Sequence, residues 1–93
     1  MADIRIEAEP ERLTAFVGDV RVGWMDFEVD GSTVRLYHTE VPAAQRGTGT
    51  GTRLVLACLA WFRDNTEYRI VPLCPFIPAV MRRFPEYNDL LKR

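Results

Sequence analysis

Polar and apolar residues alternate along most of the first half of the chain, with the two-residue period typical of β-strands. In the clearest case this alternation places Leu13, Ala15 and Val17 on one face. The later segments are also rich in β-branched and aromatic side chains, which favour strands. The pattern predicts four strands, over residues 3–7, 12–17, 20–29 and 33–41.

Short turn signals separate these strands. Gly18-Asp19 tolerates a positive φ, and Asp30-Gly31-Ser32 is a strong hairpin signal. Because connections this short join antiparallel neighbours, we expect the first half of the chain to form an antiparallel meander.

The hydrophobic period changes to that of a helix after Pro42. From there the pattern predicts a loop, a helix, a short strand and a second helix, over residues 42–51, 52–65, 68–73 and 76–84. Asn65 ends the first helix and Pro85 stops the second. A strand, a crossover helix and a further strand imply a parallel pair. The predicted fold class is therefore α+β, with a meander that leads into one βαβ unit.

Composition narrows the class of protein. Of 93 residues, 47 % are hydrophobic and 27 % charged, so we expect one folded domain over residues 1–93. The net charge of −1 argues against nucleic acid as a partner. Without a signal peptide or an apolar span, a soluble cytoplasmic protein with no membrane partner is expected. Cys74 and Cys58, a buried thiol of the predicted helix, form no C-x-x-C motif, so no metal is expected.

A glycine-rich segment, Arg46-Gly47-Thr48-Gly49-Thr50-Gly51, separates the meander from the first predicted helix. Glycines have no Cβ to keep a ligand from the backbone, and the first N–H groups of a helix are unpaired and partly positive. A diphosphate fits such a site, and Arg46 would add a charge-assisted bond. The segment lacks the lysine of a P-loop and the last glycine of a dinucleotide fingerprint. The alternative is a loop that only changes the chain's direction.

Together with its neighbours, this segment resembles a known family. R-x-x-G-x-G after a strand ending in valine is similar to the acyl-CoA-binding motif of the GNAT acetyltransferase superfamily. A small GNAT-like subfamily is similar in four ordered blocks: His38-Thr39-Glu40-Val41, Arg46-Gly47-x-Gly49-x-Gly51, Pro72-Leu73-Cys74-Pro75-Phe76 and Pro85-Glu86-Tyr87. The chain departs from it at Phe84, where the subfamily has histidine, and shows none of the N-terminal helices with which full-length GNAT enzymes hold an acceptor.

The resemblance implies a GNAT-like fold with acetyl-CoA as co-substrate. Strands 33–41 and 68–73 would splay apart, the pantetheine arm would bond to backbone near Glu40 and Val41, and the thioester would point toward Cys74. The diphosphate would meet the N–H groups of residues 47–52. The residues that the resemblance assigns to the cofactor are Val41, Arg46, Gly47, Thr48, Gly49, Thr50, Gly51, Thr52, Cys74, Pro75 and Phe76.

Two side chains near the end of strand 33–41 are candidates for a catalytic base. By the period of two, His38 and Glu40 share one face with Val34 and Leu36. An imidazole suits a general base near neutral pH, and Glu40 would serve directly or through water. The alternatives are a His38 bonded within the sheet and a Glu40 at the charged rim.

Cys74 is a candidate nucleophile. Its thiolate would accept the acetyl group and pass it on if His38 lies beside it and favours that thiolate. The alternative is a small side chain that packs where the strands diverge. By the resemblance, Tyr87 is a candidate acid for the departing CoA thiolate; otherwise it packs beside Pro85.

The sequence favours an N-acetyltransferase-like enzyme that moves an acetyl group from acetyl-CoA to an unknown small acceptor, through an acetyl-cysteine if Cys74 and His38 meet. The main alternative is a non-catalytic CoA- or acyl-CoA-binding module that acts with a partner protein. A structural protein with a vestigial glycine loop is a third reading. We expect a monomer, or a weak dimer paired through the exposed strand 3–7.

Overall fold

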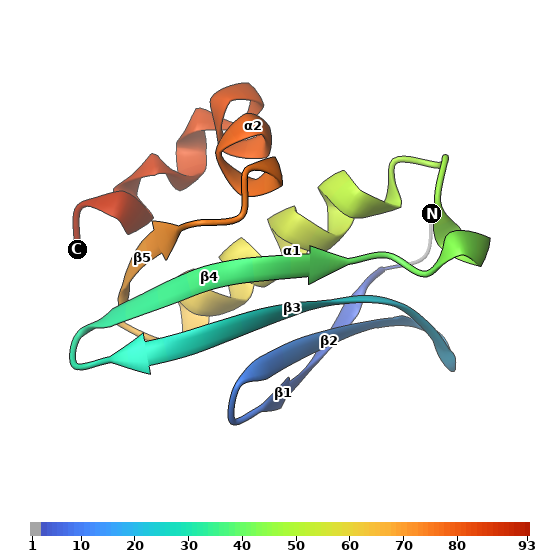
Figure 1. Cartoon of the computed structure of the whole chain (residues 1–93), viewed down its shortest axis with the longest axis horizontal. Coiled ribbons are helices and arrows are strands. Elements are labelled where there is room, and N and C mark those ends of the chain that lie inside the picture. The colour runs from blue at the N-terminus through green and yellow to red at the C-terminus, as the bar shows by residue number, and fades with distance from the viewer. Residues whose placement is uncertain (1–2) are drawn as a thin grey trace.

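The computed structural model describes residues 3–93 and contains a five-stranded sheet (Figure 1). The strands are β1 (Arg5–Glu9), β2 (Arg12–Val17), β3 (Val20–Asp30), β4 (Thr33–Glu40) and β5 (Arg69–Pro72). Their order in the sheet follows the chain. The first four are antiparallel, and β5 runs parallel to β4. The predicted α+β class, a meander that leads into a βαβ unit, is confirmed.

Helix α1 (Thr50–Asn65) connects β4 to β5 and lies across one face of the sheet, behind the strands in Figure 1. A short 3-10 turn, η1 (Ala43–Gln45), precedes it. After β5 the chain forms α2 (Phe76–Arg83) and the 3-10 helix η2 (Pro85–Leu91). Among the described helices, none combines the length and the apolar character needed to cross a membrane.

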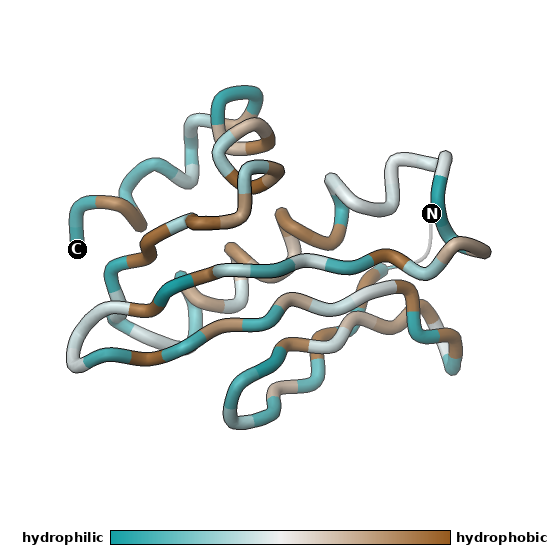
Figure 2. Tube along the Cα trace, in the orientation of Figure 1, coloured by the Kyte–Doolittle hydropathy of each residue, from teal (hydrophilic) through white to brown (hydrophobic). Residues whose placement is uncertain are grey.

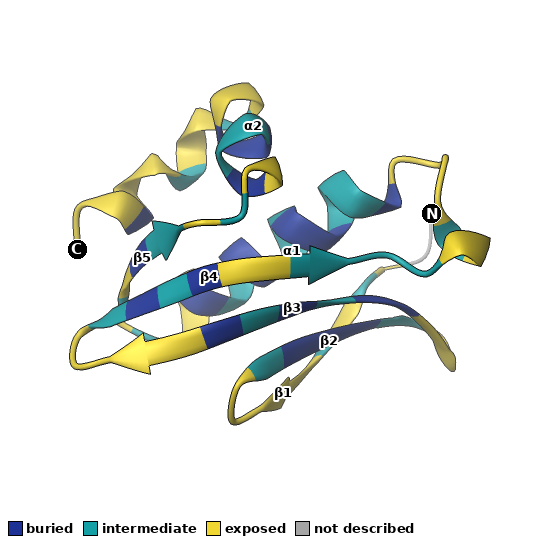
Figure 3. Cartoon of the chain, in the orientation of Figure 1, coloured by how far each residue is buried: buried dark blue, intermediate teal, exposed yellow. Residues whose placement is uncertain are grey.

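The hydrophobic core lies between α1 and the sheet. Phe62 of α1 packs edge-on against Phe27 of β3, with ring centroids 5.3 Å apart. Apolar and buried residues recur along α1 and along the strands, whereas the polar β1–β2 turn is exposed (Figures 2 and 3). The apolar side chains that α1 buries recur at the spacing of an amphipathic helix: Leu54, Val55, Cys58, Leu59 and Phe62.

The predicted elements are present, with two shifted starts. β1 covers Arg5–Glu9 and not 3–7, because its hairpin turn falls at Pro10-Glu11. Helix α1 begins at Thr50, two residues early, because Gly49 with a φ of 76° turns the chain into the helix. The other bounds agree within one residue at each end. The 3-10 helices η1 and η2 were not predicted, since such short turns carry little periodic signal.

One extra residue interrupts the pairing of β3 with β4. Leu36 lies opposite Phe27, but His38 lies opposite Asp26, the very next residue of β3. Tyr37 is therefore left over as a β-bulge. A bulge bends its strand and shifts the alternation of side chains by one position.

Because of this shift, the residues after the bulge face the opposite sides from those that the period of two predicts. Thr39 turns toward the core, and His38 and Glu40 lie on the open face of the sheet. The prediction that they share a face with Val34 and Leu36, both fully buried, is therefore wrong. They remain neighbours of each other.

β4 and β5 separate before β4 ends, as the family resemblance implied. The last paired residues are Leu36 and Pro72. The N–H groups of Leu73 and Cys74 then both donate to the Leu36 carbonyl, at 2.9 and 3.0 Å, and the chain turns away into α2. The edge of β4 up to Glu40 is thereby left without a partner strand on this side. The N–H groups of Arg69 and Leu73 point at β4, so Pro72 between them lies with its nitrogen toward the free edge of β5, where its missing N–H removes no bond to β4.

Gly23 of β3 marks a very close approach of three elements. A Cβ at this position would lie 2.7 Å from the carbonyl oxygen of Glu40 and 2.9 Å from Cδ2 of Leu54. Only glycine therefore lets β3, the end of β4 and α1 pack together here. Nothing in the local sequence around Gly23 signals this requirement.

We expect Gly23→Ala to lower the free energy of unfolding by about 1–3 kcal/mol, because the added methyl group overpacks against a backbone oxygen that cannot move freely. Gly23→Val should cost more. Chemical denaturation monitored by circular dichroism measures both. An alanine variant as stable as the wild type would contradict the close approach.

Candidate functional site

The glycine-rich segment after β4 is exposed, with open space in front of its backbone. Gly47 and Gly49 have φ angles of 85° and 76°, and a Cβ on either would meet nothing within 4 Å. Thr48 between them is also exposed; its hydroxyl lies 2.7 Å from that of Thr50 and 3.5 Å from the Gln45 carbonyl. These contacts of Thr48 stabilise the loop, and a ligand can approach its backbone directly.

Helix α1 begins at this loop without a capping side chain. Gly49 is the N-cap residue, and the first helical bond runs from the N–H of Arg53 to its carbonyl, at 3.2 Å. The N–H groups of Thr50, Gly51 and Thr52 therefore have no acceptor within the helix. No acidic residue occupies the first turn to offset the positive end of the helix dipole. This arrangement suits an anion, and its amides belong to the glycine motif itself.

Gly51 lies at a tight contact between three elements. It is helical, and a Cβ on it would lie 3.1 Å from Cζ of Phe76 and 3.9 Å from Cγ2 of Val41. The start of α1, the end of β4 and the start of α2 therefore meet at this point. Cys74 and Pro75 lead directly into α2. Several predicted cofactor residues thus border the place where β4 and β5 separate.

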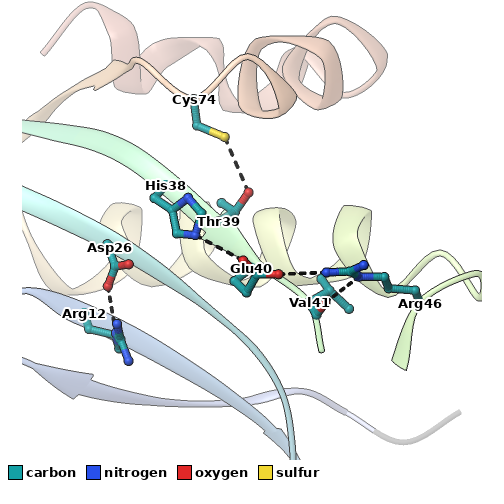
Figure 4. A network of polar contacts seen from close by, with 8 residues as sticks. All are labelled: Arg12, Asp26, His38, Thr39, Glu40, Val41, Arg46 and Cys74. Carbon is teal, nitrogen blue, oxygen red and sulfur yellow. Dashed lines mark hydrogen bonds and ion pairs between the residues drawn. The ribbon is translucent and has the colours of Figure 1, made fainter. Parts of the chain in front are cut away.

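On the open face of the sheet, His38, Glu40 and Arg46 form a chain of contacts (Figure 4). His38 Nε2 lies 3.3 Å from Glu40 Oε1, and Arg46 Nη2 lies 2.9 Å from Glu40 Oε2. Arg46 Nε also donates to the Val41 carbonyl at 2.7 Å. One carboxylate therefore contacts both the candidate base and the arginine predicted to hold a diphosphate. All three side chains are partly exposed, so water screens these pairs.

A second ion pair lies beside this chain. Asp26, opposite His38 on β3, accepts a bond from Arg12 Nε at 2.7 Å, and its side chain is only 15 % exposed. Arg12 also stacks over the ring of Trp24. Since Arg12 engages Asp26, the carboxylate in contact with His38 is that of Glu40. Asp26 could not be identified from the sequence, because its position opposite His38 depends on the bulge.

Cys74 contacts Thr39 rather than His38. Its Sγ lies 3.5 Å from Thr39 Oγ1, where β4 and β5 diverge (Figure 4). The bulge at Tyr37 turns Thr39 to this side and His38 to the other. The expected pair of Cys74 and His38 is therefore not formed. The contact of Thr39 with Cys74 was not predicted, since the period of two placed His38 on this side of the strand.

Two further residues lie away from this region. The Arg63 guanidinium sits 5.1 Å from the ring centroid of Tyr87, in the last turn of α1. That is about 20 Å along the helix from the glycine loop, so this contact fits the packing alternative for Tyr87. Cys58 is fully buried, and burial raises the pKa of its thiol.

The sequence profile of a family described as GCN5-related N-acetyl-transferase matches residues 12–90. That span runs from β2 to η2 and includes every residue of the site described above. No curated protein gives a significant match to the chain.

The two cysteines should differ sharply toward a thiol reagent. In the native protein, Ellman's reagent should label one thiol per chain, that of the part-exposed Cys74, because the buried Cys58 is both inaccessible and protonated. Cys74→Ser should remove the reaction, and denaturant should expose two thiols in the wild type. Two thiols of equal reactivity in the native protein would contradict this placement.

Proposed function

The chain belongs to the GCN5-related N-acetyltransferase family, and we propose that it binds acetyl-CoA and transfers the acetyl group to a small amine acceptor. One observation carries this proposal: the uncapped start of α1, whose free N–H groups lie behind open backbone at Gly47 and Gly49. Acyl transfer is the chemistry of the family. A coenzyme with a diphosphate accounts for an anion site at this helix terminus.

In the proposed complex, the diphosphate binds the backbone of residues 47–52, with Arg46 beside it. The pantetheine arm follows the unpartnered edge of β4 and bonds to backbone at Val41. Cys74 and Phe76 border its path on the α2 side. This pose is supported by the separation of β4 and β5, which leaves the required edge free.

The chemistry is a direct transfer. The neutral amine attacks the thioester carbonyl, a C–N bond forms, and the C–S bond breaks. The proton lost by the amine passes to His38, and the Glu40 carboxylate, 3.3 Å away, stabilises the imidazolium. Coenzyme A leaves as a thiolate and takes up one proton. By the family resemblance, the N–H group at Val41 polarises the carbonyl.

Direct transfer is favoured over an acetyl-cysteine by the contacts of Cys74. Activation of this thiol was expected from His38, but the thiol contacts the neutral hydroxyl of Thr39 instead. An exposed base on the open face suits an acceptor that arrives from that side. Cys74 then only borders the path of the pantetheine arm.

A non-catalytic acyl-CoA-binding module remains the second candidate, because one observation favours it. Among the described residues, α1 lies on the core face of the sheet, and the face that carries His38 and Glu40 has no helix over it (Figure 1). An acceptor on that face would be held by few contacts from this chain. If the protein is such a binding module, a partner protein supplies and holds the acceptor.

Saturating CoA should stabilise the wild type: at 100 times its dissociation constant it adds about 2.7 kcal/mol. The melting temperature should rise by about 10–20 °C. Gly49→Glu should abolish the shift, since its side chain fills the anion site and repels phosphate. The matched control is Gly31→Glu, also a glycine of positive φ facing open space but in the β3–β4 turn. A shift that survives in Gly49→Glu, or vanishes equally in both variants, would contradict the assigned site.

His38→Gln should lower kcat/KM for acetyl transfer by about 10²- to 10⁴-fold and leave the Kd for CoA unchanged, because it removes the base but not the cofactor site. Release of free CoA thiol, with a panel of small amines, measures turnover. Cys74→Ser should retain activity, and intact-mass measurement should find no acetyl adduct on the wild type. An adduct that Cys74→Ser abolishes would overturn direct transfer. CoA binding without turnover on any amine would favour the module.

A further inference from the structure

Two nitrogen atoms of the Arg46 side chain already have partners within the protein. Its Nε donates to the Val41 carbonyl at 2.7 Å, and its Nη2 contacts Glu40 Oε2 at 2.9 Å. These partners are a carbonyl and a carboxylate from the two residues at which the pantetheine arm is proposed to lie. The side chain therefore covers backbone that the coenzyme would use.

We propose that Glu40 is an internal competitor for the diphosphate site: in the free protein its carboxylate occupies Arg46, and cofactor binding exchanges that carboxylate for phosphate. This inference rests on the proposed use of acetyl-CoA. The arriving pantetheine amide replaces Arg46 Nε at the Val41 carbonyl, so Arg46 loses one of its two contacts within the protein. The diphosphate then offers the guanidinium a larger negative charge than one carboxylate does.

The exposure of the pair makes the exchange easy. The Arg46 side chain is 62 % exposed and that of Glu40 33 %, so solvent weakens the contact that must be broken. Asp26 does not take the place of Glu40, because Arg12 holds it at 2.7 Å. Of the two carboxylates, Glu40 is therefore the one that pairs with Arg46 and that the cofactor would displace.

The exchange has a consequence for the proton-transfer group. While Arg46 is present, Glu40 divides its charge between a permanent cation and His38. Once Arg46 leaves, the carboxylate faces His38 alone and supports its imidazolium fully. Cofactor binding therefore prepares the base, and removal of the Glu40 charge, which leaves Arg46 without a competing partner, should strengthen cofactor binding.

The test is a double-mutant cycle on CoA binding, measured by titration calorimetry at low ionic strength. Glu40→Gln keeps the size of the side chain and removes its charge, so it should bind CoA about two- to fivefold more tightly than the wild type. Arg46→Gln should bind about tenfold more weakly. In the Arg46→Gln background, Glu40→Gln should have no effect, because no cation is left to compete for.

Glu28→Gln is the control for general charge. It removes one carboxylate from the same sheet, paired there with Arg35, and should leave the Kd within about 1.5-fold. Tighter binding is a result that loss of structure does not produce, so an unfolded variant cannot mimic it.

The possible outcomes distinguish a failure of this inference from a failure of the proposed function. Weaker binding by Glu40→Gln would show that Glu40 positions Arg46 for phosphate and would overturn the exchange alone. The same gain in the Arg46→Gln background, or in Glu28→Gln, would reduce it to general charge and also overturn it. No binding of CoA by any variant or by the wild type would remove the proposed function, and this inference with it.

Discussion

The separation of β4 from β5 after Leu36 is the constraint on which the rest of the site depends. Two local features produce it. Leu73 and Cys74 both donate to the Leu36 carbonyl, which ends the ladder as the chain turns toward α2, and Tyr37 inserts an unpaired residue that bends β4 and reverses the facing of its last residues. If the two strands stayed paired to their ends, β5 would cover the edge of β4 and fill the place that Phe76 now borders.

Because of this separation, other groups can approach the end of β4 from two sides. Thr39 and Cys74 meet on the side of α2, and His38 and Glu40 lie on the open face. A coenzyme that enters beside α1 and an acceptor that arrives at the open face would therefore meet at one edge without competing for space. The proposed direct transfer, and the exchange of the Arg46 partner on cofactor binding, both follow from this division.

Most of the fold could be predicted, and so could the glycine motif. Alternation, helical spacing and turn residues act within a few positions of one another, so strands, helix and connections were found with small errors at their ends. The anion site also depends on local physics: glycine at positive φ and the unpaired amides that follow it. The start of α1 at Thr50 brought these amides closer to the glycines than predicted.

The partners of the side chains could not be predicted, because they depend on register between strands. A single bulge exchanged His38 for Thr39 as the neighbour of Cys74 and set Asp26 opposite His38. The residue types in this segment do not predict such a bulge. Gly23 shows the same limit: its need for glycine comes from the Glu40 carbonyl, which is remote in sequence. Local patterns thus determined the order of elements and the open glycine turn before α1, while packing between distant segments decided which groups face each other.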